Sequence, residues 1–168
     1  MTASSGTAIE IRRLQPTDRA RVDAMTRATG AFRDGEVAVA LEVFDAATGV
    51  TGRVDPDYET AGVTLEGELA GWACWGPTPG TLGTFDLYWI VVDPARHGQG
   101  LGGQLLAEME RRIAGRARLA LIETSGRGDY GSTRSFYERH GYRVVATIPG
   151  FYAPGDDRVT YAKSFEAR

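Results

Sequence analysis

The segment at residues 84–113 constrains this chain most, because an apolar stretch, a proline turn, a glycine-rich loop and an amphipathic pattern follow one another there. The near-continuous apolar stretch at 84–92 predicts a buried strand. Beyond the loop, apolar residues recur with the period of about 3.6 that is typical of a helix packed on one face: Leu101, Leu105, Leu106, Met109 and Ile113. A helix that begins directly after a glycine-rich loop presents its N-terminal N–H groups to an anion, so this order of elements predicts a pyrophosphate site.

Glycines at positions 98, 100, 102 and 103 make the loop conformationally permissive. Without a Cβ, the backbone can adopt positive φ angles and its N–H groups can approach an anion closely. Gly98, Gly100 and Gly103 also match the dinucleotide fingerprint, and Glu123 ends the next expected strand, where an acid would bind a ribose. That match is a weak signal, because a dinucleotide fold normally begins with this unit, whereas here it starts past the middle of 168 residues.

A second stretch, FYERHGY at residues 136–142, follows further along the chain. Together with VVDPARHGQGLGGQLL at 91–106, it resembles the general-control-related N-acetyltransferase (GNAT) superfamily, which transfers an acetyl group from acetyl-CoA to an amine. The likeness covers about residues 69–165. His97 stands where the family signature has Arg or Gln, and Tyr130 and Thr133 stand where the family often has Asn and Ala.

The resemblance implies a mixed α/β (α+β) architecture, the acyl-CoA N-acyltransferase fold. Its twisted mixed sheet of about six to seven strands has helices on both faces and a central parallel pair, here 84–92 and 119–123, that splays apart. The splay leaves backbone groups unpaired, at a cost of about 1–3 kcal/mol for each buried one, and a ligand is expected to satisfy them. The two amides of pantetheine can lie against Ile90, Val91 and Val92 as an added strand.

The expected contacts of acetyl-CoA therefore come from the end of this strand, the loop and the helix predicted at 132–140. They are Ile90, Val91, Val92, His97, Gly98, Gln99, Gly100, Leu101, Gly102, Gly103, Tyr130 and Thr133.

Acetylation of an amine needs a proton acceptor and a proton donor, because an alkylamine with a pKa of about 10.4 is almost entirely protonated at neutral pH. Asp86 and Glu123 are the candidate bases, and for each the alternative is an ordinary ion-paired strand residue. Tyr137 resembles the family tyrosine beside the CoA sulfur. A phenol is still protonated at neutral pH and can donate to the departing thiolate; the alternative is a core aromatic.

The resemblance places the acceptor groove at the first two helices and the last hairpin. The candidate lining residues are acidic or aromatic: Phe32, Glu36, Glu42, Tyr58, Tyr152, Asp156 and Asp157. Such residues suit a cationic amine, although each taken singly is equally an ordinary solvated loop residue. A small-molecule acceptor is favoured; the alternatives are a protein acceptor and a non-catalytic acyl-CoA-binding module.

Composition and charge argue against several further classes of function. A net charge of −3 gives no sequence-independent attraction to nucleic acid or an anionic membrane. No apolar run approaches the ~18 residues of a membrane span and no signal peptide is recognised at the N-terminus, so a cytoplasmic location is expected. The single Cys74 is expected to be a buried structural thiol. His97 and His140 are interpreted as loop and helix-end residues, and no metal is expected.

The chain shows no internal linker, so we expect residues 8–168 to form a single N-acetyltransferase domain after a disordered start at 1–7. Association as a homodimer is left open. Further helices are predicted at 17–29 and 34–47. Further strands are predicted at 8–14, 60–65, 69–75, 142–148 and 158–165, with a hairpin turn at Glu66-Gly67, a rigid surface turn at 76–80 and a loop over GFYAPGDD at 150–157.

Overall fold

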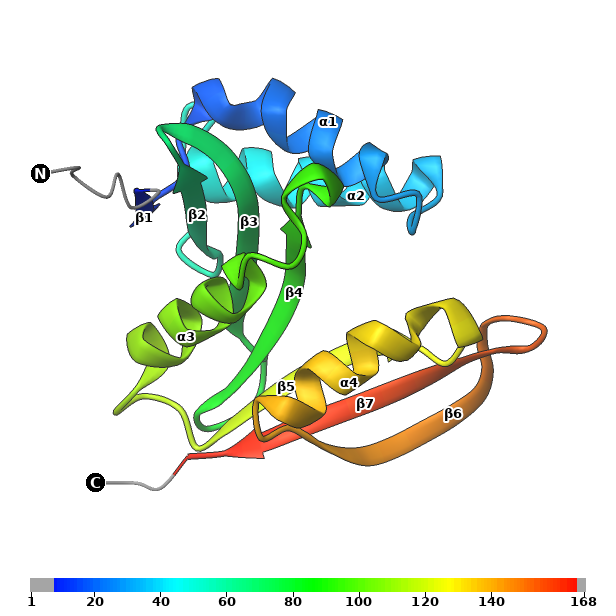
Figure 1. Ribbon diagram of the computed structural model, residues 1–168. Helices are drawn as coiled ribbons and strands as arrows, with labels where there is room; N and C mark the ends of the chain where they lie inside the picture. Colours follow the sequence, from blue (N-terminus) through cyan, green and yellow to red (C-terminus); the bar gives the residue numbers. More distant parts are fainter. Residues whose placement is uncertain (1–7, 166–168) are drawn as a thin grey trace, which may run out of the picture. The chain divides into compact units, whose positions relative to one another are not determined.

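The computed structural model describes residues 8–165, so the expectation for residues 1–7 lies outside the described part (Figure 1). Its strands and α-helices, in chain order, are β1 (Ile9–Arg12), α1 (Arg19–Ala28), α2 (Asp34–Thr48), β2 (Glu59–Leu65), β3 (Glu68–Pro77), β4 (Thr84–Val92), α3 (Leu101–Ile113), β5 (Leu119–Ser125), α4 (Gly131–Arg139), β6 (Arg143–Ala153) and β7 (Asp156–Ser164). Short 3-10 helices lie at Pro16–Asp18, Pro94–Arg96 and Gly128–Tyr130.

Hydrogen-bonded neighbours in the sheet follow the order β1-β2-β3-β4-β5-β7-β6. β4 and β5 run parallel, whereas the pairs β1–β2, β2–β3, β5–β7 and β6–β7 are antiparallel. The mixed seven-stranded sheet with four α-helices, observed over residues 8–165, confirms the predicted fold class.

The chain divides into two compact units. Unit 1 contains residues 8–75 and 89–112, and unit 2 contains residues 76–88 and 113–165. β4 contributes its first part to unit 2 and its last part, from Trp89 onwards, to unit 1. Each unit has its own buried residues.

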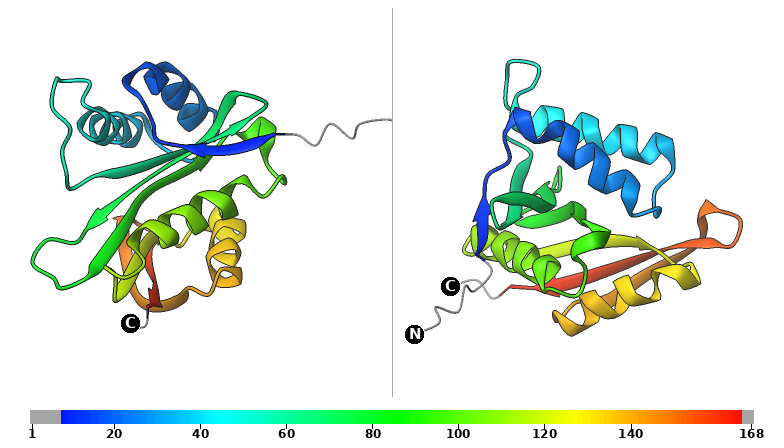
Figure 2. Two further views of the ribbon diagram at one scale, coloured as in Figure 1. Left: turned by 90° about the vertical axis from the view of Figure 1, so that its left-hand side faces the viewer. Right: turned by 45° about the horizontal axis from the view of Figure 1, so that its top comes forward.

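In unit 1, helices cover both faces of β2 and β3 (Figures 1 and 2). The indole N–H of Trp72 donates to the Thr26 hydroxyl of α1 at 3.1 Å, and the Trp72 ring packs edge-on against Phe44 of α2. Gly71 points to the other face, where a Cβ would lie 3.2 Å from Leu105 Cδ1 of α3. The buried residues on the α1–α2 side are Leu14, Val22, Met25, Val37, Ala40, Leu41, Phe44, Ala47, Leu69, Trp72, Cys74 and Val91.

Cys74 belongs to this core, and burial raises the pKa of its thiol well above the usual value. The prediction of a structural thiol is confirmed. A thiol held in its protonated form by an apolar environment is a poor nucleophile.

In unit 2, α4 lies along one face of β5, β7 and β6 (Figures 1 and 2). The ring of Tyr137 on α4 packs against Tyr142 and Tyr161, with centroids 6.3 and 5.9 Å apart. Tyr161 is in register with Ile122, so these two side chains share the face that α4 covers. Because successive side chains of a strand alternate between faces, Glu123 on β5 lies on the opposite face.

Two predicted loops are partly strand. β3 continues to Pro77, so residues 76–77 are not part of a turn. The stretch GFYAPGDD was wrongly predicted as a loop: β6 and β7 extend through most of it, and Pro154 and Gly155 alone join them. Antiparallel pairing of Ala153 with Asp156 overrides the turn-forming composition of this stretch.

Other local predictions are confirmed. Glu66 and Gly67 both have positive φ, 54° and 83°, as a two-residue hairpin turn of type I′ requires. Gly141, with φ 86°, follows the last turn of α4. No helix among residues 8–165 has the length and apolar character needed to cross a bilayer.

Candidate active site

The glycine-rich loop of unit 1 is fixed to the sheet at Asp93, directly after β4. The backbone N–H of Asp93 donates to the Ala70 carbonyl of β3 at 2.8 Å. The Asp93 carboxylate accepts from the Ala95 N–H at 2.9 Å and pairs with the Arg21 guanidinium of α1. The hydrogen bond from the Ala95 N–H, and after it the contact with Arg21, hold the pKa of Asp93 below its usual value. The carboxylate therefore stays ionised at neutral pH. The position where the loop begins is therefore rigidly determined.

Gly98 and Gly100 adopt left-handed backbone conformations, with φ angles of 77° and 76°. A Cβ at either position would meet no other atom within 4 Å, so backbone geometry, not crowding within the protein, requires glycine there. Gly102 and Gly103 differ from the expectation, because they lie in the first turn of α3 and are not loop residues. The first N–H groups of an α-helix have no partner within the helix, so this turn offers donors to an anion.

Other candidate cofactor residues of unit 1 contribute differently. His97 is exposed, with Nε2 3.0 Å from the Val92 carbonyl of its own loop. The side chains of Leu101 and Val91 are buried in the protein, so only their backbone groups could contact a ligand. Ile90 and Val92 are half-buried, and Gln99 is exposed.

Tyr137 lies inside unit 2 and is only 4% exposed. Burial raises the pKa of its phenol well above the usual value, which keeps the group protonated throughout the neutral range. Tyr130 and Thr133 lie at the other end of α4. The Arg127 guanidinium stands 5.2 Å from the centroid of the Tyr130 ring, and Thr133 is half-buried in the first turn.

Asp86 and Glu123 share one face of the unit 2 sheet. Asp86 is in register with Leu121, and Leu121 and Glu123 are alternate residues of β5. The parallel pairing of β4 and β5 runs from Thr84 with Leu119 to Leu87 with Ile122, so Glu123 is the first β5 residue beyond it. This face is opposite to the one that α4 and Tyr137 cover.

The surroundings of the two carboxylates differ. Asp86 Oδ2 accepts a hydrogen bond from the Thr78 hydroxyl at 2.6 Å and is half-buried. Glu123 is 48% exposed on its side chain, and its Oε1 lies 3.4 Å from Nη1 of Arg158. Sequence reasoning identified neither Thr78 nor Arg158 as a partner.

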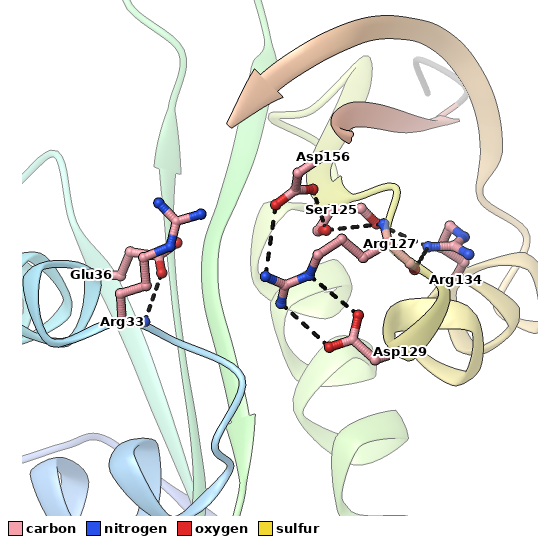
Figure 3. Close-up of polar contacts among 7 residues, drawn as sticks. All are labelled: Arg33, Glu36, Ser125, Arg127, Asp129, Arg134 and Asp156. Carbon is pink, nitrogen blue, oxygen red and sulfur yellow. Dashed lines mark hydrogen bonds and ion pairs between the residues drawn. The ribbon is translucent and has the colours of Figure 1, made fainter. Parts of the chain in front are cut away.

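Three of the acceptor candidates in unit 1 lie against other residues of this unit, whereas Glu42 of α2 is exposed. Phe32 packs edge-on against Trp89, with centroids 5.2 Å apart. Glu36 accepts from the backbone N–H of Arg33 at 2.8 Å and so caps the start of α2 (Figure 3). Tyr58 lines a cavity of about 200 Å³ together with Arg13 and Arg112.

In unit 2, Asp156 is 5% exposed and accepts from the Ser125 hydroxyl. Figure 3 shows the Arg127 side chain between Asp156 and Asp129, with ion-pair distances of 3.9 and 3.2 Å. Arg134 Nη1 donates to the carbonyls of Ser125 and Arg127 at 2.9 and 2.8 Å, which ties α4 to the end of β5. No local sequence pattern indicates this network, because its members come from β5, the segment between β5 and α4, α4 itself and β7.

Tyr152 and Asp157 lie near the same turn. The ring of Tyr152 packs against Phe151 with centroids 5.0 Å apart, and Asp157 Oδ1 accepts from the Gly150 N–H at 2.8 Å. Of the candidates in this hairpin, Tyr152 is half-buried and Asp156 is buried.

We expect Asp156→Ala to lower the free energy of unfolding by about 2 kcal/mol, because it leaves the buried Ser125 hydroxyl without its acceptor. Asp129→Ala is the matched control, since Asp129 also pairs with Arg127 but is exposed, and should cost about 0.5 kcal/mol or less. Urea unfolding followed by circular dichroism measures both. Equal losses for the two variants would contradict a role for Asp156 as the buried anchor.

Residues 56–144 match the acetyltransferase (GNAT) domain family. A solved structure from Desulfovibrio desulfuricans, assigned to the GNAT family of acetyltransferases, is 40% identical with a TM-score of 0.86, over 94% of this chain and 99% of that chain. The chain belongs to the GNAT family. It is therefore an acetyltransferase that uses acetyl-CoA as its donor, and the dinucleotide reading of the glycine spacing is set aside.

More distant GNAT structures share the fold. The ribosomal-protein-S18-alanine N-acetyltransferase of Escherichia coli is 20% identical with a TM-score of 0.75, over 94% of each chain. An aminoglycoside 6'-N-acetyltransferase in complex with coenzyme A is 18% identical with a TM-score of 0.73, over 95% of this chain and 98% of that chain. No curated protein matches the chain. Within residues 8–165, no group of three or more His, Cys, Asp and Glu side chains is arranged to hold a metal ion.

Proposed function

We propose that this GNAT member transfers the acetyl group of acetyl-CoA directly to a primary amine of a small molecule. The observation that carries the proposal is the rigidly anchored loop with Gly98 and Gly100 in left-handed conformations, followed at once by the N-terminus of α3. Successive backbone N–H groups in such a loop, together with the helix dipole, favour a pyrophosphate. The loop and the first turn of α3 bind the pyrophosphate of CoA, and the backbone of Ile90 to Val92 receives its pantetheine arm.

Tyr137 is the proposed proton donor to the CoA thiolate that leaves when the acetyl group is transferred. Its burial supports this role, because a phenol whose pKa is raised holds its proton until a stronger base forms beside it. Tyr130 and Thr133 are proposed to contact the cofactor from the start of α4.

Glu123 is the preferred base, and Asp86 is second. The Asp86 carboxylate already accepts a short hydrogen bond from Thr78, whereas the Glu123 side chain is 48% exposed on the face of β5 opposite to α4. A carboxylate in that position can take the amine proton directly or through a water molecule. The residues proposed to line the acceptor site remain Phe32, Glu36, Tyr58, Tyr152 and Asp156. Because Asp156 is buried, we assign it the role of positioning its neighbours and not of touching the acceptor.

We expect Glu123→Gln to lower the rate of acetylation by about 10²-fold at neutral pH, the usual contribution of a general base. The loss should shrink as pH rises toward the amine pKa of about 10, because the amine is then already neutral. Steady-state rates at subsaturating amine, from pH 6 to pH 10, measure the effect, with Asp86→Asn as the comparison. A loss that is the same at every pH would indicate damage to positioning or folding. Near-full activity of both variants at neutral pH would remove both carboxylates from the role of base.

Release of CoA thiol from acetyl-CoA in the presence of a broad amine panel tests the proposed activity as a whole. The panel includes polyamines, aminoglycosides, amino acids and peptides with free N-termini, and a reaction without amine controls for hydrolysis. Amine-dependent release with small molecules supports the proposal. Release with peptides alone would make the acceptor a protein, and no amine-dependent release would leave a non-catalytic acyl-CoA-binding module.

A further inference from the structure

Arg158 of β7 places a positive charge on the same face of the unit 2 sheet as Glu123, the face opposite to α4. It is in register with Ser125 of β5 and Ile148 of β6, and it is two residues from Thr160, the register partner of Glu123. Because residues two apart on a strand share a face, Arg158 and Glu123 are diagonal neighbours, and Nη1 lies 3.4 Å from Glu123 Oε1. The sheet therefore presents adjacent opposite charges on the side that α4 leaves uncovered.

The protein does not use the full donor capacity of this guanidinium. Arg158 Nε is buried and has no hydrogen-bond partner among residues 8–165. The contact with Glu123 is longer than the roughly 2.7–2.9 Å of a charge-assisted hydrogen bond, so it is a loose ion pair. An arginine kept for stability alone would be expected to have its buried N–H paired, and such an exception suggests a role beyond packing.

The orientation of the guanidinium is set by Phe151 of β6. Its Cζ lies 4.4 Å from the centroid of the Phe151 ring, within the range of a cation–π contact. The Arg158 side chain is 24% exposed although its Nε atom is buried, so a ligand can reach part of this side chain. A charged group that is already held in place loses less conformational entropy when it binds a partner.

We propose that Arg158 binds a carboxylate of the acceptor and that the acceptors of this enzyme are therefore amino acids or other amino-carboxylates. The proposal rests on the proposed function, which assigns Glu123 to the amine. A zwitterionic acceptor matches the pair, with its amine at Glu123 and its carboxylate on the planar donor fork of Arg158. The negative charge of Glu123 disfavours a doubly charged phosphate in the same place more than a singly charged carboxylate.

The test compares acceptors that differ only in the carboxylate. Values of kcat/KM are measured for the common L-α-amino acids and β-alanine and for their carboxamides. Each value is corrected for the fraction of the amine that is neutral at the assay pH. O-phosphoethanolamine is included as an acceptor that carries a phosphate in place of the carboxylate, and is called the phosphate arm. The wild type should prefer the carboxylate of its best pair by roughly tenfold or more, as expected for a hydrogen bond to a charged group. Arg158→Gln should reduce this ratio to about twofold or less, mainly through KM, and Arg158→Lys should restore part of it.

Two further variants separate charge from structure. Arg143→Gln removes an exposed arginine from β6 and should leave the carboxylate preference unchanged. Phe151→Leu removes the aromatic ring beside Arg158 and should weaken the carboxylate preference. Because Phe151 is 49% exposed, this variant should fold, so it tests the proposal even if Arg158→Gln does not fold. No preference in the wild type, a preference that survives in Arg158→Gln and Phe151→Leu, or a preference for the phosphate arm would each overturn the proposal.

Binding separates failure of this proposal from failure of the proposed function. Calorimetric titration of the same pairs into protein saturated with CoA requires no turnover. If no amine is acetylated, the acetyl-transfer proposal fails. The carboxylate site would still be supported if the acids bound more tightly than their amides and Arg158→Gln abolished that difference. Equal affinity for each acid and its amide would overturn the carboxylate site.

Discussion

Gly100→Val is expected to abolish the stabilisation that acetyl-CoA gives to the folded protein. A ligand that binds only the native state at a hundredfold excess over its dissociation constant stabilises it by about 2.7 kcal/mol, which is visible as a rise in Tm. Gly100 has a φ of 76°, and its missing Cβ faces open space next to the first turn of α3. A valine there strains the backbone and places two methyl groups where the pyrophosphate is proposed to lie. We expect an affinity loss of about 100-fold or more, equivalent to about 2.7 kcal/mol.

Gly67→Val is the matched control for this experiment. Gly67 also has positive φ, 83°, and open space at its Cβ position, but it lies in the β2–β3 turn. Both variants should lower the Tm of the unliganded protein, and Gly67→Val alone should keep the shift with acetyl-CoA. Thermal melts with acetyl-CoA and with NAD provide the readout. A Gly100→Val protein that retains the acetyl-CoA shift would remove the loop from the cofactor site.

Tyr137→Phe is expected to lower kcat by about 10²- to 10⁴-fold, the usual contribution of a positioned acid, while the affinity for acetyl-CoA should stay within about twofold. The ring and its packing against Tyr142 and Tyr161 are retained, so the change isolates the hydroxyl. Since burial raises the pKa of Tyr137, its proton remains in place through neutral pH, and ionisation of this residue should not reduce the rate below its ordinary pKa of about 10. Steady-state kinetics and acetyl-CoA titration measure the two quantities.

Tyr161→Phe provides the corresponding control. Tyr161 is also a buried tyrosine of unit 2 that contacts Tyr137, and its hydroxyl donates to Glu138 at 3.0 Å. Its loss should cost about 1 kcal/mol of stability with little effect on kcat. If Tyr137→Phe turned over as fast as the wild type, Tyr137 would be an ordinary core residue.

The loop and the helix after it were determined by the sequence, because their signals are local. Glycine at positions 98 and 100 permits left-handed backbone, and the apolar period from Leu101 to Ile113 places one face of α3 in the core. The glycine that stops the chain from continuing α4, Gly141, was determined in the same way. Each of these features depends on neighbours within one or two turns of chain, so neither strand pairing nor packing had to be known first.

The partners of the charged residues were decided by tertiary structure alone. Asp156 follows a Pro-Gly turn that suggests an exposed loop, yet β7 pairs with both β5 and β6 and buries it against Ser125. The same pairing register brings Arg158 beside Glu123 and puts both on the face that α4 does not cover. Registry joins residues far apart in sequence, and a shift by one residue would reverse every face, so no local pattern fixes which charges meet.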